Sequence, residues 1–176
     1  TDTVYGVAAL PSVPGATARL ARLKQRALDQ PLAVLVADAD QVAALAEPPG
    51  AVADGWMAAH WPGPLTLVLR RRPSALALEL GGAPATVGVR CPDHPFVRAL
   101  AARVGPLATT SANRHGEPTP TTAAEAAAAL DGPVDLVVDG GPAGTLASTV
   151  VDVTGPAPRI LRVGALAPAD LGLPPP

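Results

Sequence analysis

PLATTSANRHGEPTPTTAAEAAAAL, residues 106–130, contains the succession of elements that decides the fold class. Its apolar start predicts a strand over 106–111 that leads directly into a polar loop. Thr122 and Glu125 have the spacing of a capping box, in which each side chain satisfies a free backbone N–H group of the other residue, so a helix is predicted over 123–130. A strand, a polar loop and a capped helix in this order are typical of α/β proteins.

The loop between these two elements, TTSANRHGEPTPTT at 109–122, has almost no apolar side chains. Pro118 and Pro120 exclude a regular helix or a central strand through its second half, because proline lacks the backbone N–H group. Nearly half of the whole chain, 48%, is apolar. The loop is therefore either a solvated connection or the lining of a site for a polar ligand.

Hydrophobic periodicity predicts further elements on both sides of this stretch. Strands and helices alternate over the first half of the chain, and strands follow one another later, which favours an α/β fold with a mixed sheet and packed helices. The Pro-rich pieces are too short to be interdomain linkers, so we expect a single domain over 1–176. The predicted helices are 16–28, 39–46, 51–60 and 95–104, and the predicted strands are 3–9, 31–37, 65–70, 85–90, 134–139, 148–154 and 159–163.

The composition excludes several classes of protein. The net charge is −2, which is not typical of a protein that binds nucleic acid strongly. Cys91 is the single cysteine, which excludes a disulfide within the chain and a zinc site built from cysteines. No apolar run approaches the ~20 residues of a membrane span, and no signal peptide is visible, so we expect a cytoplasmic protein with no membrane partner.

Polar side chains gather where the predicted strands begin or end. Arg90, Ser111 and Ser148 hold such positions, and ligands of α/β proteins bind where strand ends and loops meet. Arginine and hydroxyl groups suit a ligand that carries phosphate and carboxylate groups. The nucleotide and hydrolase motifs GxxxxGK[ST], GxGxxG and GxSxG do not occur. The three histidines, His60, His94 and His115, lack the spacing of metal ligands.

Six motifs follow one another along the chain: TDTVYG, LKQR…PLAVLV, WPGPLTLVL, VGVRCPDHP, TTSAN…GEPTPTT and STVVDVTG…ILRVG. In this order they resemble the YrdC/TsaC family, the threonylcarbamoyl-AMP synthases, from residue 1 to about residue 165. The resemblance implies a single YrdC-like domain, a twisted mixed sheet with packed helices and a concave ligand pocket. It also implies the short form of the family, with the family's first helix and strand missing ahead of Thr1.

The resemblance implies a reaction. L-Threonine and bicarbonate combine as a carbamate, which ATP adenylates to give threonylcarbamoyl-AMP and pyrophosphate. The chain would thus be a nucleotidyltransferase of tRNA processing, and a separate complex would transfer the threonylcarbamoyl group to tRNA as threonylcarbamoyladenosine. The implied partners are ATP, L-threonine and bicarbonate, with Mg²⁺ bound to ATP and no metal ligand from the protein.

Site residues follow from the same resemblance. Carbamate attack on the α-phosphate needs aligned anions and neutralised charge, so no covalent nucleophile is expected. The implied threonine-binding residues are Thr3, Arg90, Ser111 and Ser148, with Arg90 on the threonine carboxylate. The implied ATP-binding residues are Lys24, Arg26, Gln30, Thr86, Asn113, Thr121 and Arg162, with Lys24 and Arg26 on the phosphates.

Three positions depart from the family pattern. Gln30 stands where the family usually has asparagine, Leu35 where long members often have histidine, and Ala147 where they often have glutamate. Leu35 removes a polar contact near threonine, so the expected specificity for threonine is weakened more than the expected nucleotide binding.

Two other functions are left open by the sequence. The same fold has been linked to binding of double-stranded RNA or tRNA, which a net charge of −2 and 2% aromatic residues disfavour. The other is a YrdC domain that forms carbamoyl-adenylate from carbamoyl phosphate, although such domains usually occur with further domains.

Overall fold

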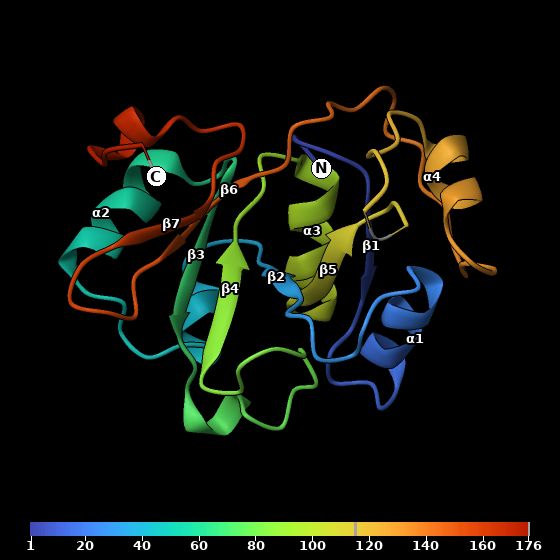
Figure 1. Cartoon of the computed structure of the whole chain (residues 1–176). Coiled ribbons are helices and arrows are strands. Elements are labelled where there is room, and N and C mark those ends of the chain that lie inside the picture. Colours follow the sequence, from blue (N-terminus) through green and yellow to red (C-terminus); the bar gives the residue numbers. More distant parts are fainter. Residues whose placement is uncertain (115, 176) are drawn as a thin grey trace.

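The computed structural model describes residues 1–114 and 116–175, in which seven strands form one mixed sheet (Figure 1). His115 therefore lies outside the described residues. The order across the sheet is β1-β5-β2-β4-β3-β6-β7, with β2/β4 and β3/β6 parallel and the other four pairs antiparallel. The strands are β1 (Gly6–Ala9), β2 (Ala33–Leu35), β3 (Leu65–Arg70), β4 (Thr86–Arg90), β5 (Leu107–Ser111), β6 (Thr149–Asp152) and β7 (Arg159–Arg162).

Four of the five predicted helices are present, and the bounds of two agree with the prediction to the residue. The helix predicted over 16–28 ends at Leu23, because Gln25 has a φ of 51°, a left-handed conformation that cannot continue a helix. The helix predicted over 39–46 is a short 3₁₀ helix, Asp40–Ala44. The α-helices are α1 (Ala16–Leu23), α2 (Ala51–His60), α3 (Pro95–Val104) and α4 (Ala123–Ala129), the last with the predicted capping box.

The strand predicted over 134–139 is wrong. This segment passes outside the sheet, and its Leu136 is 77% exposed. A strand needs a neighbour whose backbone groups pair with its own, and β1, the outermost strand on this side, pairs only with β5 within the described residues. The apolar run at 134–139 carried no information about whether such a partner exists.

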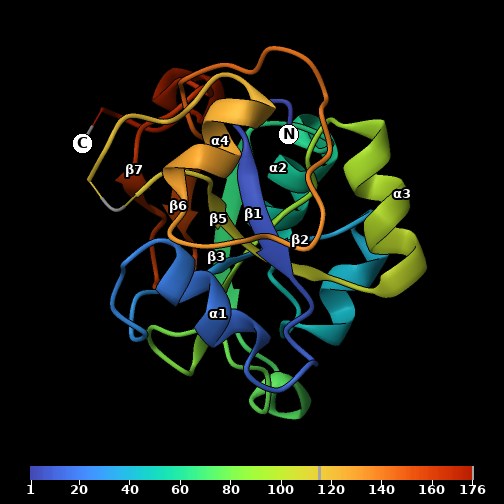
Figure 2. The same ribbon diagram turned by 90° about the vertical axis from the view of Figure 1, so that its right-hand side faces the viewer.

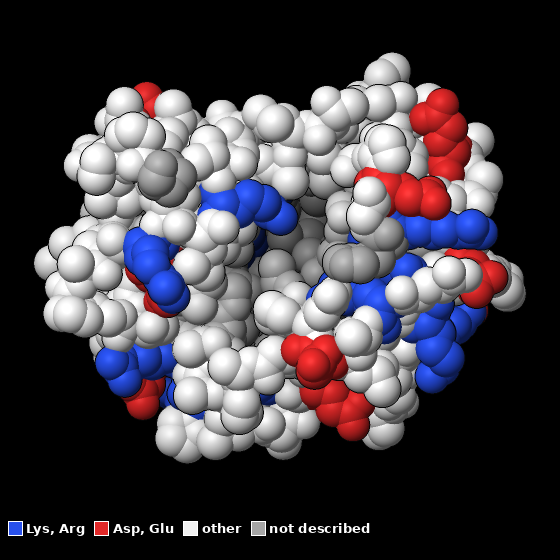
Figure 3. All heavy atoms as spheres, in the orientation of Figure 1, with Lys and Arg blue, Asp and Glu red and all other residues white. Residues whose placement is uncertain are grey.

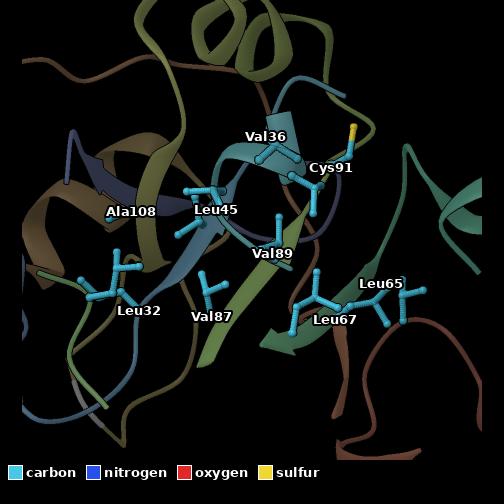
Figure 4. Packing of buried hydrophobic residues seen from close by; sticks show 14 of the residues in the cluster. Leu32, Val36, Leu45, Leu65, Leu67, Val87, Val89, Cys91 and Ala108 are labelled. Carbon is cyan, nitrogen blue, oxygen red and sulfur yellow. The ribbon is translucent and has the colours of Figure 1, made fainter. Parts of the chain in front are cut away.

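One face of the central strands forms the hydrophobic core (Figure 4). Side chains alternate between the two faces of a strand, and those on the core face of β3 and β4 pack with residues of α2 and of the 3₁₀ helix at 40–44. None of them is more than 3% exposed: Leu65, Leu67, Leu69, Val87 and Val89. The opposite face carries Thr66, Val68 and Arg70 of β3 and Thr86, Gly88 and Arg90 of β4, most of which are polar.

In Figure 2 the edge strand β1 is nearest to the viewer. The same view shows that α3 lies behind the sheet when the molecule is seen as in Figure 1. The front of β3 and β4 thus stays visible in Figure 1. No helix of the described residues is long and apolar enough to cross a membrane.

Candidate functional site

A hollow lies over the middle of the sheet, between β4 and β5, and lysine and arginine side chains flank it on two sides (Figure 3). Most of the residues predicted to bind ligand belong to networks of direct contacts around this region. The sheet positions Arg90, Ser111 and Arg162, which end strands, and Ser148, which directly precedes one.

The first network is centred on Lys24, the residue that follows α1. Its ammonium group donates to the backbone carbonyl of Ser111 at 2.5 Å, to the Ser111 hydroxyl at 3.2 Å and to Asn113 Oδ1 at 3.1 Å. Burial and, as a smaller cause, the nearby charge of Arg26 lower the pKa of Lys24 from 10.5 to about 8. The structure therefore brings together Lys24, Ser111 and Asn113, three of the predicted residues, around a cation that is only 4% exposed.

Arg26 and Gln30 lie beside this network. The Arg26 guanidinium donates to Thr110 Oγ1 at 3.2 Å and to the carbonyl of Pro31 at 3.1 Å. Both predicted residues line a cavity of about 350 Å³, together with small side chains of α1. Arg26 thus connects the end of β5 with this cavity.

The second network holds Arg90, which is 5% exposed at the end of β4. Its guanidinium donates to the Gly63 carbonyl at 2.9 Å, to Thr3 Oγ1 at 2.8 Å and to Asp2 Oδ1 at 2.6 Å. A guanidinium has five N–H groups, so these three bonds leave two for a ligand. Burial lowers the pKa of Arg90, the adjacent Asp2 raises it, and the charge of Arg162 lowers it to a smaller extent.

The third network joins Arg162 of β7 to Ser148. Arg162 Nε and Nη2 donate to the Ser148 carbonyl at 3.0 and 2.9 Å, and Nη2 also donates to the Ser148 hydroxyl at 3.1 Å. The Ser148 hydroxyl shares a further hydrogen bond of 2.8 Å with Thr66 of β3, and both hydroxyl groups are buried. The residues expected to bind threonine and nucleotide are here in direct contact.

Neither Thr121 nor Thr86 forms a hydrogen bond to these networks within the described residues. Thr121 donates its N–H and hydroxyl groups to Glu125 Oε2 and thus extends the cap of α4. Thr86 begins β4, and its hydroxyl group donates to the Ala83 carbonyl at 3.4 Å.

Sequence reasoning missed two residues that support the site. Asp2 forms an ion pair with Arg90, and Thr66 holds Ser148. A threonine inside the apolar strand LTLVLR was the available signal for Thr66, because a buried hydroxyl group needs a partner. No comparable signal exists for Asp2, whose partner is 88 positions away.

A cavity larger than the one beside Arg26 lies elsewhere. It has a volume of about 1060 Å³ and lies beside β1, between α1, α3 and the extended segment around 134–144. None of the predicted site residues, all of which are described, lines it. The volume of a cavity therefore does not locate the polar networks in this fold.

Comparisons with known proteins agree with the resemblance seen in the sequence. The family model of Sua5, YciO and YrdC, described as "Telomere recombination", matches residues 1–164. The threonylcarbamoyl-AMP synthase of Bacillus subtilis is 40% identical over 168 residues, which cover 94% of this chain and 49% of that protein. The threonylcarbamoyl-AMP synthase of Chromohalobacter salexigens is 38% identical over 138 residues, which cover 78% of this chain and 74% of that protein.

A solved structure gives the same result. The crystal structure of Pyrococcus abyssi Sua5 complexed with L-threonine has a TM-score of 0.90 and 36% identity, and the match covers 97% of this chain and 51% of that one. The chain thus spans about half the length of the Bacillus and Pyrococcus relatives.

Proposed function

The chain belongs to the Sua5/YciO/YrdC family, and from this premise we propose that it forms threonylcarbamoyl-AMP and pyrophosphate from L-threonine, bicarbonate and ATP. One observation carries the proposal. Two basic networks, Lys24 with Ser111 and Asn113, and Arg162 with Ser148, gather the hydroxyl and cationic groups that an adenylation of a carbamate requires. The relatives named above supply the substrate class.

In the proposed reaction the protein aligns the carbamate with the α-phosphate of ATP. A carbamate oxygen attacks the α-phosphorus of ATP, the bond to the bridging oxygen of the β-phosphate breaks, and pyrophosphate leaves with that electron pair. Lys24 and Arg26 neutralise phosphate charge, while the two remaining N–H groups of Arg90 bind the threonine carboxylate. Ser148 contacts threonine, and Arg162 faces the nucleotide.

Further parts of the proposal concern ions and partners. We propose that Mg²⁺ arrives bound to the triphosphate as part of the substrate and that the reaction takes place in the cytoplasm. The product is an activated acyl-adenylate, so a second protein that transfers the threonylcarbamoyl group to tRNA must consume it.

The test is pyrophosphate release measured with substrates omitted in turn. We expect release to need ATP, bicarbonate and L-threonine together, because the attacking group is the carbamate that the last two form. Carbamoyl phosphate in place of bicarbonate and threonine tests the carbamoyl-adenylate alternative. If the rate of pyrophosphate release is the same with and without bicarbonate and the amino acid, the adenylation of a carbamate is refuted.

Contact between Ser148 and Arg162 predicts coupled effects of their substitution. Ser148→Ala removes a hydroxyl contact of about 0.5–1.5 kcal/mol, so L-threonine affinity is expected to fall by up to about tenfold. Arg162→Ala removes a charged contact, so ATP affinity is expected to fall by about ten- to a hundredfold. The double variant should lose less than the two single variants combined, because residues in contact are not independent.

Calorimetric titration of both ligands against the three variants measures this coupling. Arg159→Ala is the control, because Arg159 lies on the same strand but is 74% exposed and forms only a surface ion pair. Strictly additive losses, or a loss of threonine binding alone in Arg162→Ala, would contradict the assigned roles.

A further inference from the structure

Three apolar residues, with Gly88 in the middle, lie side by side across the centre of the sheet and are half-buried. Gly88 of β4 pairs with Ala33 of β2 on one side and with Val68 of β3 on the other. All three strands are inner strands of the sheet, so solvent reaches these residues through its face. Their neighbours along the chain on the opposite face are at most 7% exposed: Leu32, Val34, Leu67, Leu69, Val87 and Val89. The row Ala33–Gly88–Val68 is thus an accessible floor on an otherwise packed sheet.

Neither the backbone nor the packing explains a glycine at position 88. Gly88 does not have the positive φ that only glycine adopts easily. A Cβ atom added there would lie 3.6 Å from Thr66 Cγ2 and 4.0 Å from Ala33 Cα, which are ordinary contact distances. Glycine weakens the interior of a strand and often marks a place where a ligand approaches the backbone closely. The space above Gly88 is therefore the feature that requires an explanation.

The floor lies between the polar networks. The methyl group nearest to Gly88 belongs to Thr66, whose hydroxyl group bonds Ser148, the partner of Arg162. Arg90 follows two positions later on the same face of β4. Ser111, bonded to Lys24, ends β5, which is three strand spacings, about 14 Å, from β3.

From this placement we infer that Gly88 determines which ligands fit: the linkage between nucleotide and amino acid passes over its bare backbone, and a side chain at this position excludes it. The inference rests on the proposed function, in which that linkage is the carbamate and the α-phosphate. The missing side chain of Gly88, at the centre of the row, leaves the space through which both substrates reach their networks.

Gly88→Val separates binding from stability. Valine is favoured in strands, so the melting temperature is expected to stay equal or rise. The affinities for ATP with Mg²⁺ and for L-threonine are each expected to fall more than tenfold, because the branched side chain fills the space above the floor. Ala8→Val is the matched control: it adds the same side chain at an exposed position of β1, and neither affinity should change.

Calorimetric titration and thermal unfolding give the deciding outcomes. A folded Gly88→Val that binds both ligands as tightly as the wild type overturns the inference. If Gly88→Val does not fold, Gly88→Ala decides, since its Cβ fits without movement: a two- to tenfold loss of affinity supports the inference, and unchanged affinity for both ligands overturns it. A wild type that binds ATP without releasing pyrophosphate contradicts the proposed function, yet the Gly88 variants remain testable on ATP alone.

Discussion

Arg90→Ala is expected to lower the free energy of unfolding by about 3 kcal/mol, the lower end of the range for buried pairs, because it leaves the partly buried Asp2 carboxylate without its partner. The Asp2 and Arg90 side chains are 16% and 6% exposed and lie 2.6 Å apart. The substitution also removes the donors to Thr3 Oγ1 and to the Gly63 carbonyl. Urea unfolding measured on the wild type and on Arg90→Ala gives the difference directly.

Two comparisons locate the origin of this effect. Adding Asp2→Ala to Arg90→Ala should recover part of the lost stability, because no unpaired carboxylate remains. Arg159→Ala breaks a pair with Asp152 at 3.4 Å in which the arginine side chain is 74% exposed, and it should lower the free energy of unfolding by less than about 1 kcal/mol. If Arg90→Ala and Arg159→Ala lower the free energy of unfolding by the same amount, burial of the Asp2–Arg90 pair has no effect on stability.

Arg90→Lys examines the binding role of the same residue. Lysine keeps the charge beside Asp2 but cannot present a planar fork to a carboxylate. L-Threonine affinity is therefore expected to fall by about ten- to a hundredfold, while ATP affinity is largely kept. An equal loss for both ligands would indicate a general distortion of the site.

Lys24→Met is expected to lower ATP affinity by about ten- to a hundredfold, because it removes the only lysine from the phosphate side of the proposed site. The Ser111 hydroxyl and Asn113 Oδ1 still bond each other at 2.5 Å, so the fold should change little. Arg22→Met is the control: Arg22 is an exposed residue of the same helix, and its loss removes the same charge. A similar fall of ATP affinity in both variants would show a general charge effect.

The pKa of Lys24 also predicts a pH dependence. Because this pKa is lowered to about 8, the ammonium group loses its proton as the pH rises from 7 to 9, and ATP affinity should fall over this range. Lys24→Arg stays protonated and should remove this dependence. The stability of the unliganded protein should change in the opposite direction: the unfolded chain keeps its proton up to the ordinary pKa of 10.5, so stability rises with pH between about 8 and 10.5.

Local patterns in the sequence determined most of the elements. Strand β3 and helices α2 and α3 begin and end at the predicted residues, and the capping box of Thr122 and Glu125 is formed. These signals depend on neighbours within one or two turns of chain, such as a proline at a helix start or the alternation in LTLVLR. They are therefore present in the sequence itself.

The family resemblance supplied the candidate site, and the tertiary structure decided how its members meet. The sequence placed Ser148 and Arg162 on neighbouring strands, but their direct contact follows from the antiparallel pairing of β6 with β7. The partnership of Asp2 with Arg90 joins residues 88 positions apart, and no local pattern marks it.

The wrong prediction of a strand at 134–139 and the inability of the sequence to show the accessible floor at Gly88 have the same physical reason. Periodicity reports which residues avoid water, but it does not report which strand lies alongside or which face of an inner strand stays uncovered. Both depend on backbone pairing between distant segments. The sequence by itself thus determined the elements and their polar ends, while the order of the strands in the sheet decided which of those ends form a site.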